Sequence, residues 1–150
     1  MLDWIEATTV ARSVATSATA TAWLSAVHAV GFALVMGSAL VSNLRGMGGL
    51  LRQCSLAEVV RPANRVIALG LLVSASTGLP LFAARAGEAA ANGAFRLKML
   101  LLLAAATVQF TLVRSAAMRA TARHARTASA AALALWIGLA LTAFAFVLLE

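Results

Sequence analysis

The amino-acid sequence predicts an all-α integral membrane protein: an antiparallel four-helix bundle preceded by a short amphipathic interfacial helix. Hydrophobic residues make up 62% of the 150 residues and charged residues 11%, well above the roughly 45–50% apolar content of soluble domains. The apolar residues gather in four stretches of about 20 residues, the length that crosses a ~30 Å hydrocarbon core as a helix. Alanine and leucine dominate these stretches, which favours helices over a barrel of alternating strands.

The four predicted spans belong to one domain that covers residues 1–150. Residues 1–19 combine Leu2, Trp4 and Val10 with Glu6, a mixture typical of an amphipathic helix on the membrane surface. The connections are short, so we expect sequential helices to be neighbours in the bundle. The spans cover about residues 21–44, 64–84, 95–115 and 129–149.

The net charge of +7 comes from basic residues placed mainly between the apolar stretches. Eight of them fall in the first and third connections, against four near the other ends of the spans. The positive-inside rule then places both of these connections in the cytoplasm and both termini in the periplasm, for a protein of the bacterial inner membrane. Such a distribution is a topology signal within the lipid bilayer and does not indicate nucleic-acid binding. The eight residues are Arg45, Arg52, Arg61, Arg65, Arg114, Arg119, Arg123 and Arg126.

Small residues recur every fourth position in the second span, at Gly70, Ser74 and Gly78. This spacing places all three on one helix face, where a neighbouring backbone can approach closely. We expect this face to be a contact seam of the bundle, or to join a second copy or a larger membrane complex.

Two ionisable side chains fall inside predicted spans, His28 and Lys98. Charged groups at membrane depth are costly, so they mark candidate functional sites. Counted from the outer surface at 1.5 Å per residue, His28 lies about 10 Å deep and Lys98 about 5 Å deep. The same count places Ser76 and Thr77 at a similar height, with Met99 beside Lys98, and so predicts a polar pocket in the outer leaflet.

This pocket suits a cofactor. A neutral imidazole can ligate a metal or haem iron, and a nearby cation can hold a haem propionate or a quinone oxygen. Two structural alternatives stay open: His28 hydrogen-bonds a neighbouring helix, and Lys98 extends to the headgroups. The predicted topology puts His124 on the opposite side of the membrane, so a second axial ligand is Met99, Lys98, water or a residue of another subunit.

A second polar cluster is expected near the cytoplasmic surface. Asn43 and Arg45 close the first span, while Asn64 and Arg65 open the second. Helix capping and anchoring of lipid phosphates account for these residue types. Gln109 in the third span is expected to reach the same level and to bond across helices.

The sequence lacks the motifs of several enzyme classes. It contains no Walker loop, HExxH pair, Ser/His/Asp set or paired intramembrane carboxylates, so ATPase, hydrolase and proton-pump functions have no support. The single cysteine, Cys54, excludes an internal disulfide.

Three segments carry a family resemblance: "WLSAVHAVGFALVMGSALVSNLRGMG", "STGLPLF" and "NGAFRLKMLLLL". They resemble a family of small bacterial four-helix membrane proteins. More distantly, they are similar to the membrane protoporphyrinogen oxidases of the HemJ type and to the copper-resistance D-domain proteins. The oxidase resemblance implies that His28 is a haem ligand and Lys98 a functionally required lysine, with Gly37 and Arg45 matching a following glycine and arginine. The connection "LRGMGGLLRQ" departs from the oxidase pattern, so the resemblance extends to haem binding and not to porphyrinogen oxidation.

These observations lead to one main functional hypothesis. The protein binds haem b or a porphyrin and passes electrons between an outer-face partner and the quinone pool, with His28 on the iron and Lys98 on a propionate. An alternative is a non-catalytic accessory or anchoring subunit of a larger complex. A third is copper handling, for which Met36, Met47 and Met99 offer thioether ligands at different depths.

Overall fold

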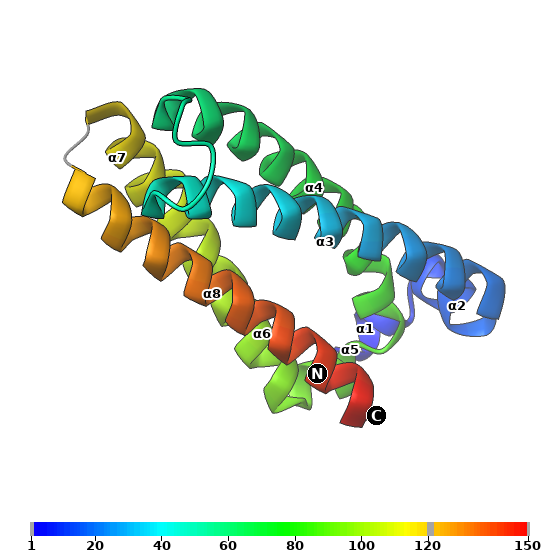
Figure 1. The fold of residues 1–150 in the computed structure, drawn as a ribbon. Helices are drawn as coiled ribbons and strands as arrows, with labels where there is room; N and C mark the ends of the chain where they lie inside the picture. Colours follow the sequence, from blue (N-terminus) through cyan, green and yellow to red (C-terminus); the bar gives the residue numbers. More distant parts are fainter. Residues whose placement is uncertain (1, 120–121, 150) are drawn as a thin grey trace.

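The computed structural model describes residues 2–119 and 122–149, and these residues form helices with no β-strand (Figure 1). The predicted all-α class is therefore confirmed. Four helical segments are long and apolar enough to cross a membrane. They are α3 (Ala18–Met47), α4 (Leu56–Ala84), the run of α6 (Gly93–Val108), η1 (Gln109–Val113) and α7 (Arg114–Arg119), and α8 (Ala122–Leu149).

The helices extend beyond the predicted spans because polar caps, and not apolar composition, set their ends. Ser17 Oγ accepts from Ala20 N at 3.2 Å at the start of α3, and Gly48 ends that helix in the left-handed conformation, at φ 83°. A capping box opens α4: Ser55 Oγ accepts from Glu58 N, and the Glu58 carboxylate accepts from Ser55 N at 2.7 Å. Such caps satisfy backbone N–H groups that have no partner inside the helix.

The N-terminal segment contains two short helices, α1 (Asp3–Glu6) and α2 (Thr9–Thr16), where the sequence predicts one. The break occurs at Thr8, which is extended and whose hydroxyl oxygen accepts from Ala11 N at the start of α2. Both helices contact the end of the bundle instead of standing apart from it. The Glu6 carboxylate accepts a hydrogen bond of 2.7 Å from Gly87 N in α5 (Ala86–Ala91).

The helices α3 and α4 touch along their backbones. A Cβ atom at Gly31 would lie 2.9 Å from the Gly70 carbonyl oxygen, and one at Gly70 would lie 2.7 Å from the Gly31 carbonyl oxygen. One turn further along α4, Ser74 Oγ donates to the His28 carbonyl oxygen at 3.4 Å. The face that carries Gly70, Ser74 and Gly78 is thus covered by α3 of the same chain.

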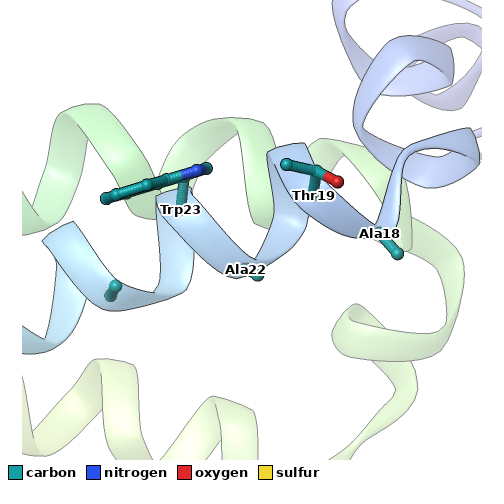
Figure 2. A pocket seen from close by; sticks show the side chains of 5 residues that line it. Ala18, Thr19, Ala22 and Trp23 are labelled. Atoms are coloured by element: carbon teal, nitrogen blue, oxygen red, sulfur yellow. The ribbon is translucent and has the colours of Figure 1, made fainter.

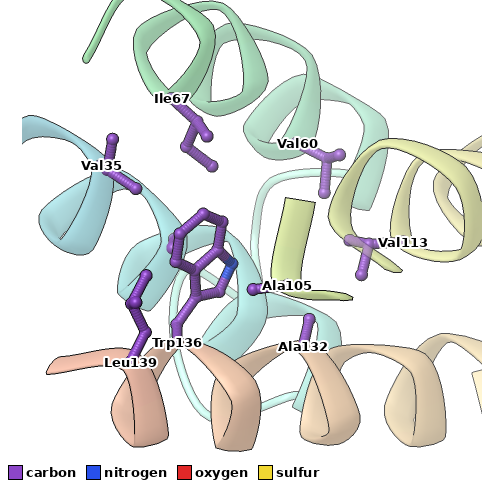
Figure 3. Packing of buried hydrophobic residues seen from close by; sticks show 9 residues of the cluster. Val35, Val60, Ile67, Ala105, Val113, Ala132, Trp136 and Leu139 are labelled. Carbon is purple, nitrogen blue, oxygen red and sulfur yellow. The ribbon is translucent and has the colours of Figure 1, made fainter. Parts of the chain in front are cut away.

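The four long segments form two pairs, α3 with α4 and α6 with α8. The pairs meet through contacts between α3 and α8, and η1 and α7 reach α4 (Figure 1). The apolar core lies at this junction, around the indole of Trp136 (Figure 3). We call the end of the bundle where the two helix pairs meet the Gln109 end, after a buried residue of η1. The other end, where α3 begins, is the His28 end. The core residues are Val35, Ala39, Val60, Ile67, Ala105, Val113, Ala132, Trp136 and Leu139.

The backbone contact between α3 and α4 predicts unequal effects of two alanine substitutions. Gly70→Ala should lower the free energy of unfolding by about 1–3 kcal/mol, because the new methyl group overlaps α3. Gly37→Ala, where no atom lies within 4 Å of the added Cβ, should be neutral or stabilising by up to about 1 kcal/mol through helix propensity. Unfolding of both variants in mixed detergent and SDS micelles measures the difference, and equal stability would contradict the contact.

Candidate functional site

His28 lies against α4, where its ring is held by a threonine. Its Nδ1 atom is 3.2 Å from Thr77 Oγ1. The Thr77 hydroxyl has one hydrogen, which it donates to the Val73 carbonyl oxygen at 2.8 Å. The hydroxyl oxygen therefore accepts from Nδ1–H, and this hydrogen bond selects the tautomer in which Nε2 carries a lone pair.

The absence of a side chain at Gly78 makes room for this ring. A Cβ atom there would lie 2.9 Å from His28 Cε1 and 3.2 Å from Nδ1. Thr77 is buried and His28 is half-buried. The ring also interacts with the backbone of Ser74, which belongs to α4 as Thr77 does. The ring is thus held against α4.

Lys98 lies on α6, which packs on α8, η1 and α5. It is half-buried, and it precedes the buried residues Ala105 and Gln109 by 7 and 11 positions, which places all three on one helix face. The structure therefore brings together His28 and Thr77 from α3 and α4. Lys98 belongs to the other helix pair and is related to His28 only through its charge.

Two further residues of the predicted pocket, Ser76 and Met99, lie elsewhere, and so does Arg45, which the oxidase resemblance adds to the site. Ser76 is exposed and donates to the Val73 carbonyl oxygen of its own helix at 2.9 Å. Met99 is 39% exposed on α6. Arg45 lies 17 residues beyond His28 on α3, which corresponds to about 26 Å, and its Nε and Nη2 donate to the Cys54 carbonyl oxygen at 3.0 and 2.6 Å. Arg45 thus fixes the connection between α3 and α4.

A second polar site surrounds Gln109, which is fully buried. Its Oε1 atom accepts from Asn43 Nδ2 at 2.9 Å and from Trp136 Nε1 at 3.4 Å. Its Nε2 atom donates to Asn64 Oδ1 at 2.8 Å and to Ser42 Oγ at 3.4 Å. One amide therefore links α3, α4 and α8, which confirms that Gln109 bonds across helices. We call Ser42, Asn43, Asn64, Gln109 and Trp136 the Gln109 cluster.

Sequence reasoning missed two features of this cluster. Trp136 looks like an ordinary apolar residue in a span, and its indole N–H gives no sign of its partner. Gln109 also begins a π-helical turn, η1, a rare irregularity within α-helices that often marks functional sites. The usable signal was the presence of three uncharged amides, Asn43, Asn64 and Gln109, within or at the edge of apolar spans.

A shallow apolar hollow follows the first turns of α3 (Figure 2). At 100° per residue, most of its lining lies on the face of α3 away from His28. Trp23 is 69% exposed beside it. The hollow is therefore separate from both polar sites. It is lined by Ala18, Thr19, Ala22, Trp23 and Ala26.

The fold and the two sites define a class: an all-α protein with four helices apolar enough to cross a membrane, one half-buried histidine site and one buried amide cluster. Comparison of the chain with protein-family models, with curated proteins and with solved structures finds no match. The resemblance to the protoporphyrinogen oxidases and copper-resistance proteins stays a prediction based on short motifs.

The hydrogen bonds of Gln109 predict a large cost for its removal. Gln109→Leu would leave Asn43 Nδ2, Trp136 Nε1 and Asn64 Oδ1 without this partner, and each such buried group costs about 1–3 kcal/mol. The free energy of unfolding in SDS titrations should fall by at least about 2 kcal/mol. Gln53→Leu in the exposed connection is the control and should change little. Equal stability of the two variants would show that the cluster contributes nothing.

Proposed function

We propose that the chain is a multi-pass protein of the bacterial inner membrane, an antiparallel bundle with both termini in the periplasm. Four apolar helices of sufficient length support insertion into the lipid bilayer. The excess of arginines in the first and third connections supports the orientation. Contacts that advance along α3 while they retreat along α4 support the antiparallel pairing: His28 with Gly78, Gly31 with Ser74, and Val35 with Gly70.

Within this bundle, we propose that His28 binds the iron of a b-type haem or a related porphyrin. The observation that carries the proposal is the 3.2 Å contact between His28 Nδ1 and Thr77 Oγ1. With the Thr77 hydrogen on the Val73 carbonyl oxygen, Nδ1–H is the donor in this contact and Nε2 is the nitrogen that would bind the iron. Histidines that bind metals usually donate their other N–H to a fixed acceptor, which orients the ring and raises its basicity. A bound haem would supply one-electron redox chemistry between an outer-face partner and the quinone pool.

Two residues bear on haem binding at His28. Gly78, which has no side chain, lets the imidazole pack against α4. Lys98 provides a positive charge at the same end of the bundle, where it can hold an anionic propionate.

The sequence offers Lys98, Met99, water or a residue of another subunit as a further ligand. Of these, Met99 gains no support, because it is 39% exposed on α6. Among the described residues, no group of three His, Cys, Asp or Glu residues gathers into a metal site. Lys98, water or a residue of another subunit would then accompany His28. His124 lies in the first turn of α8, and α8 begins at the end of the bundle away from α2 and α5 (Figure 1).

The two other hypotheses gain less support. An accessory or anchoring role requires a surface for a larger complex or a second copy, and α3 covers the face of Gly70, Ser74 and Gly78. Copper handling requires clustered thioethers. Met36 and Met47 are 11 residues apart on α3, a separation of about 16 Å. We therefore keep the haem proposal as the main one.

Haem binding is tested by the visible spectrum of protein purified in detergent from cells supplied with haem. We expect a Soret band and a reduced-minus-oxidised b-type difference spectrum in the wild type. Both should be lost in His28→Ala, because the iron loses its axial ligand, and kept in His124→Ala. A wild type without a Soret band, or a His28→Ala spectrum equal to the wild type, would refute the proposal.

The hydrogen bond to Thr77 gives a finer test. Thr77→Val removes the acceptor of Nδ1–H at nearly constant volume, and loss of such an outer-shell partner typically lowers affinity about 10- to 100-fold. Thr77→Ser restores a hydroxyl and should recover most of the affinity. Haem titration followed at the Soret band measures these values. Ser76→Ala is the control one position away, and a Thr77→Val affinity equal to it would exclude the inferred tautomer role.

A further inference from the structure

Three buried polar atoms near the Gln109 cluster have no hydrogen-bond partner among the described residues. They are Asn43 Oδ1, Asn64 Nδ2 and Ser129 Oγ. Asn43 is 0% exposed, Ser129 1% and Asn64 8%. Buried polar groups in proteins are almost always hydrogen-bonded to protein or to ordered water. The concentration of three unpaired atoms in one region therefore points to a bound molecule.

The hydrogen bonds of the Gln109 cluster determine how each amide is oriented, and so which unpaired atom is a donor and which is an acceptor. The indole N–H of Trp136 can only donate, so the Gln109 atom that faces it must be the oxygen. Gln109 Nε2 then donates to Asn64, which must present its oxygen and turn its NH₂ group away. Asn43 Nδ2 meets two acceptors, the Ala39 carbonyl oxygen and Gln109 Oε1, so its own oxygen is turned away. Reversing any of these amides would bring two donors or two acceptors together.

Ser129 lies next to the same face of α3. A Cβ atom at Gly46 would overlap the Ser129 side chain, so the glycine makes room for this hydroxyl. Gly46 follows Asn43 by three residues, which places both on one face of α3, one turn apart. The unpaired amide oxygen and the unpaired hydroxyl therefore belong to adjacent turns of the same interface between α3 and α8.

The unpaired atoms are one acceptor, one donor and one hydroxyl, which together select a neutral ligand. An anion would be repelled by Asn43 Oδ1, and a metal cation would be repelled by the NH₂ group of Asn64. Water both donates and accepts, and it normally makes about three hydrogen bonds when buried. We propose that the Gln109 cluster is a binding site for internal water, which accepts from Asn64 Nδ2 and donates to Asn43 Oδ1 and Ser129 Oγ.

This water site is separate from the proposed haem site. Asn43 lies 15 residues beyond His28 on α3, or about 22 Å. The core side chains Val35, Ala39 and Ile67 occupy positions between the two. Water binding at the Gln109 cluster is therefore independent of haem binding at His28, and the two are tested separately.

X-ray radiolytic labelling with mass spectrometry tests the proposal on the full chain in detergent, because bound water generates hydroxyl radicals next to buried side chains. After correction for intrinsic reactivity, Trp136 should be oxidised several-fold faster than Val35, although Trp136 is 0% and Val35 1% exposed. The excess should disappear in the Asn43→Leu/Asn64→Leu double variant. Oxidation of Trp136 at the corrected rate of Val35 in the wild type would overturn the proposal.

Ser129→Ala provides a second test that does not require a disruptive variant. If water bonds the hydroxyl, its removal loses a hydrogen bond and the SDS concentration at half-unfolding should fall. If the hydroxyl is dry and unpaired, its removal relieves an unfavourable burial and the midpoint should rise or stay unchanged, which would overturn the proposal. Ser25→Ala on the exposed side of α3 is the control for a serine-to-alanine change in a long helix.

Discussion

The hydrogen-bonded side-chain amide of Gln109 is the interaction on which the arrangement of the helices depends. In the proposed membrane setting, hydrophobic burial does not specify which helix faces meet, because lipid tails solvate leucine as well as another helix does. A buried amide does specify it, since its oxygen and nitrogen require partners at fixed positions. Gln109 finds them on α3, α4 and α8, and so fixes the point where the two helix pairs meet.

The second constraint is the backbone contact of α3 with α4. Gly31 and Gly70 allow an approach that a methyl group on either would prevent. This approach brings Ser74 to the His28 carbonyl oxygen and places the imidazole between Thr77 and Gly78. The position of the histidine is thus a consequence of helix packing that begins two turns away, and the site cannot be understood from His28 alone.

Much of the fold could be predicted from the sequence, because span length and apolar content are physical requirements that a sequence shows directly. The association of His28 with Thr77 could also be predicted, since equal depth in neighbouring helices brings residues together. The hydrogen-bond partner of Arg45 could not be predicted, because it is a backbone carbonyl, at Cys54, in an irregular connection. The π-turn at Gln109 and the break at Thr8 depend on local hydrogen bonds that apolar periodicity does not record.

The two polar sites differ in which of their polar atoms take part in hydrogen bonds. In the Gln109 cluster, every atom of the central amide is used, and the unpaired atoms lie at the edges in full burial, where only a small neutral molecule can satisfy both a donor and an acceptor. At His28, the half-buried ring is held by two neighbours on α4, the Thr77 hydroxyl and the Ser74 backbone. Since the Thr77 hydrogen is directed to the Val73 carbonyl oxygen, we infer that Nδ1 carries the ring proton and donates to Thr77. Nε2 is then the nitrogen that the haem proposal assigns to the iron.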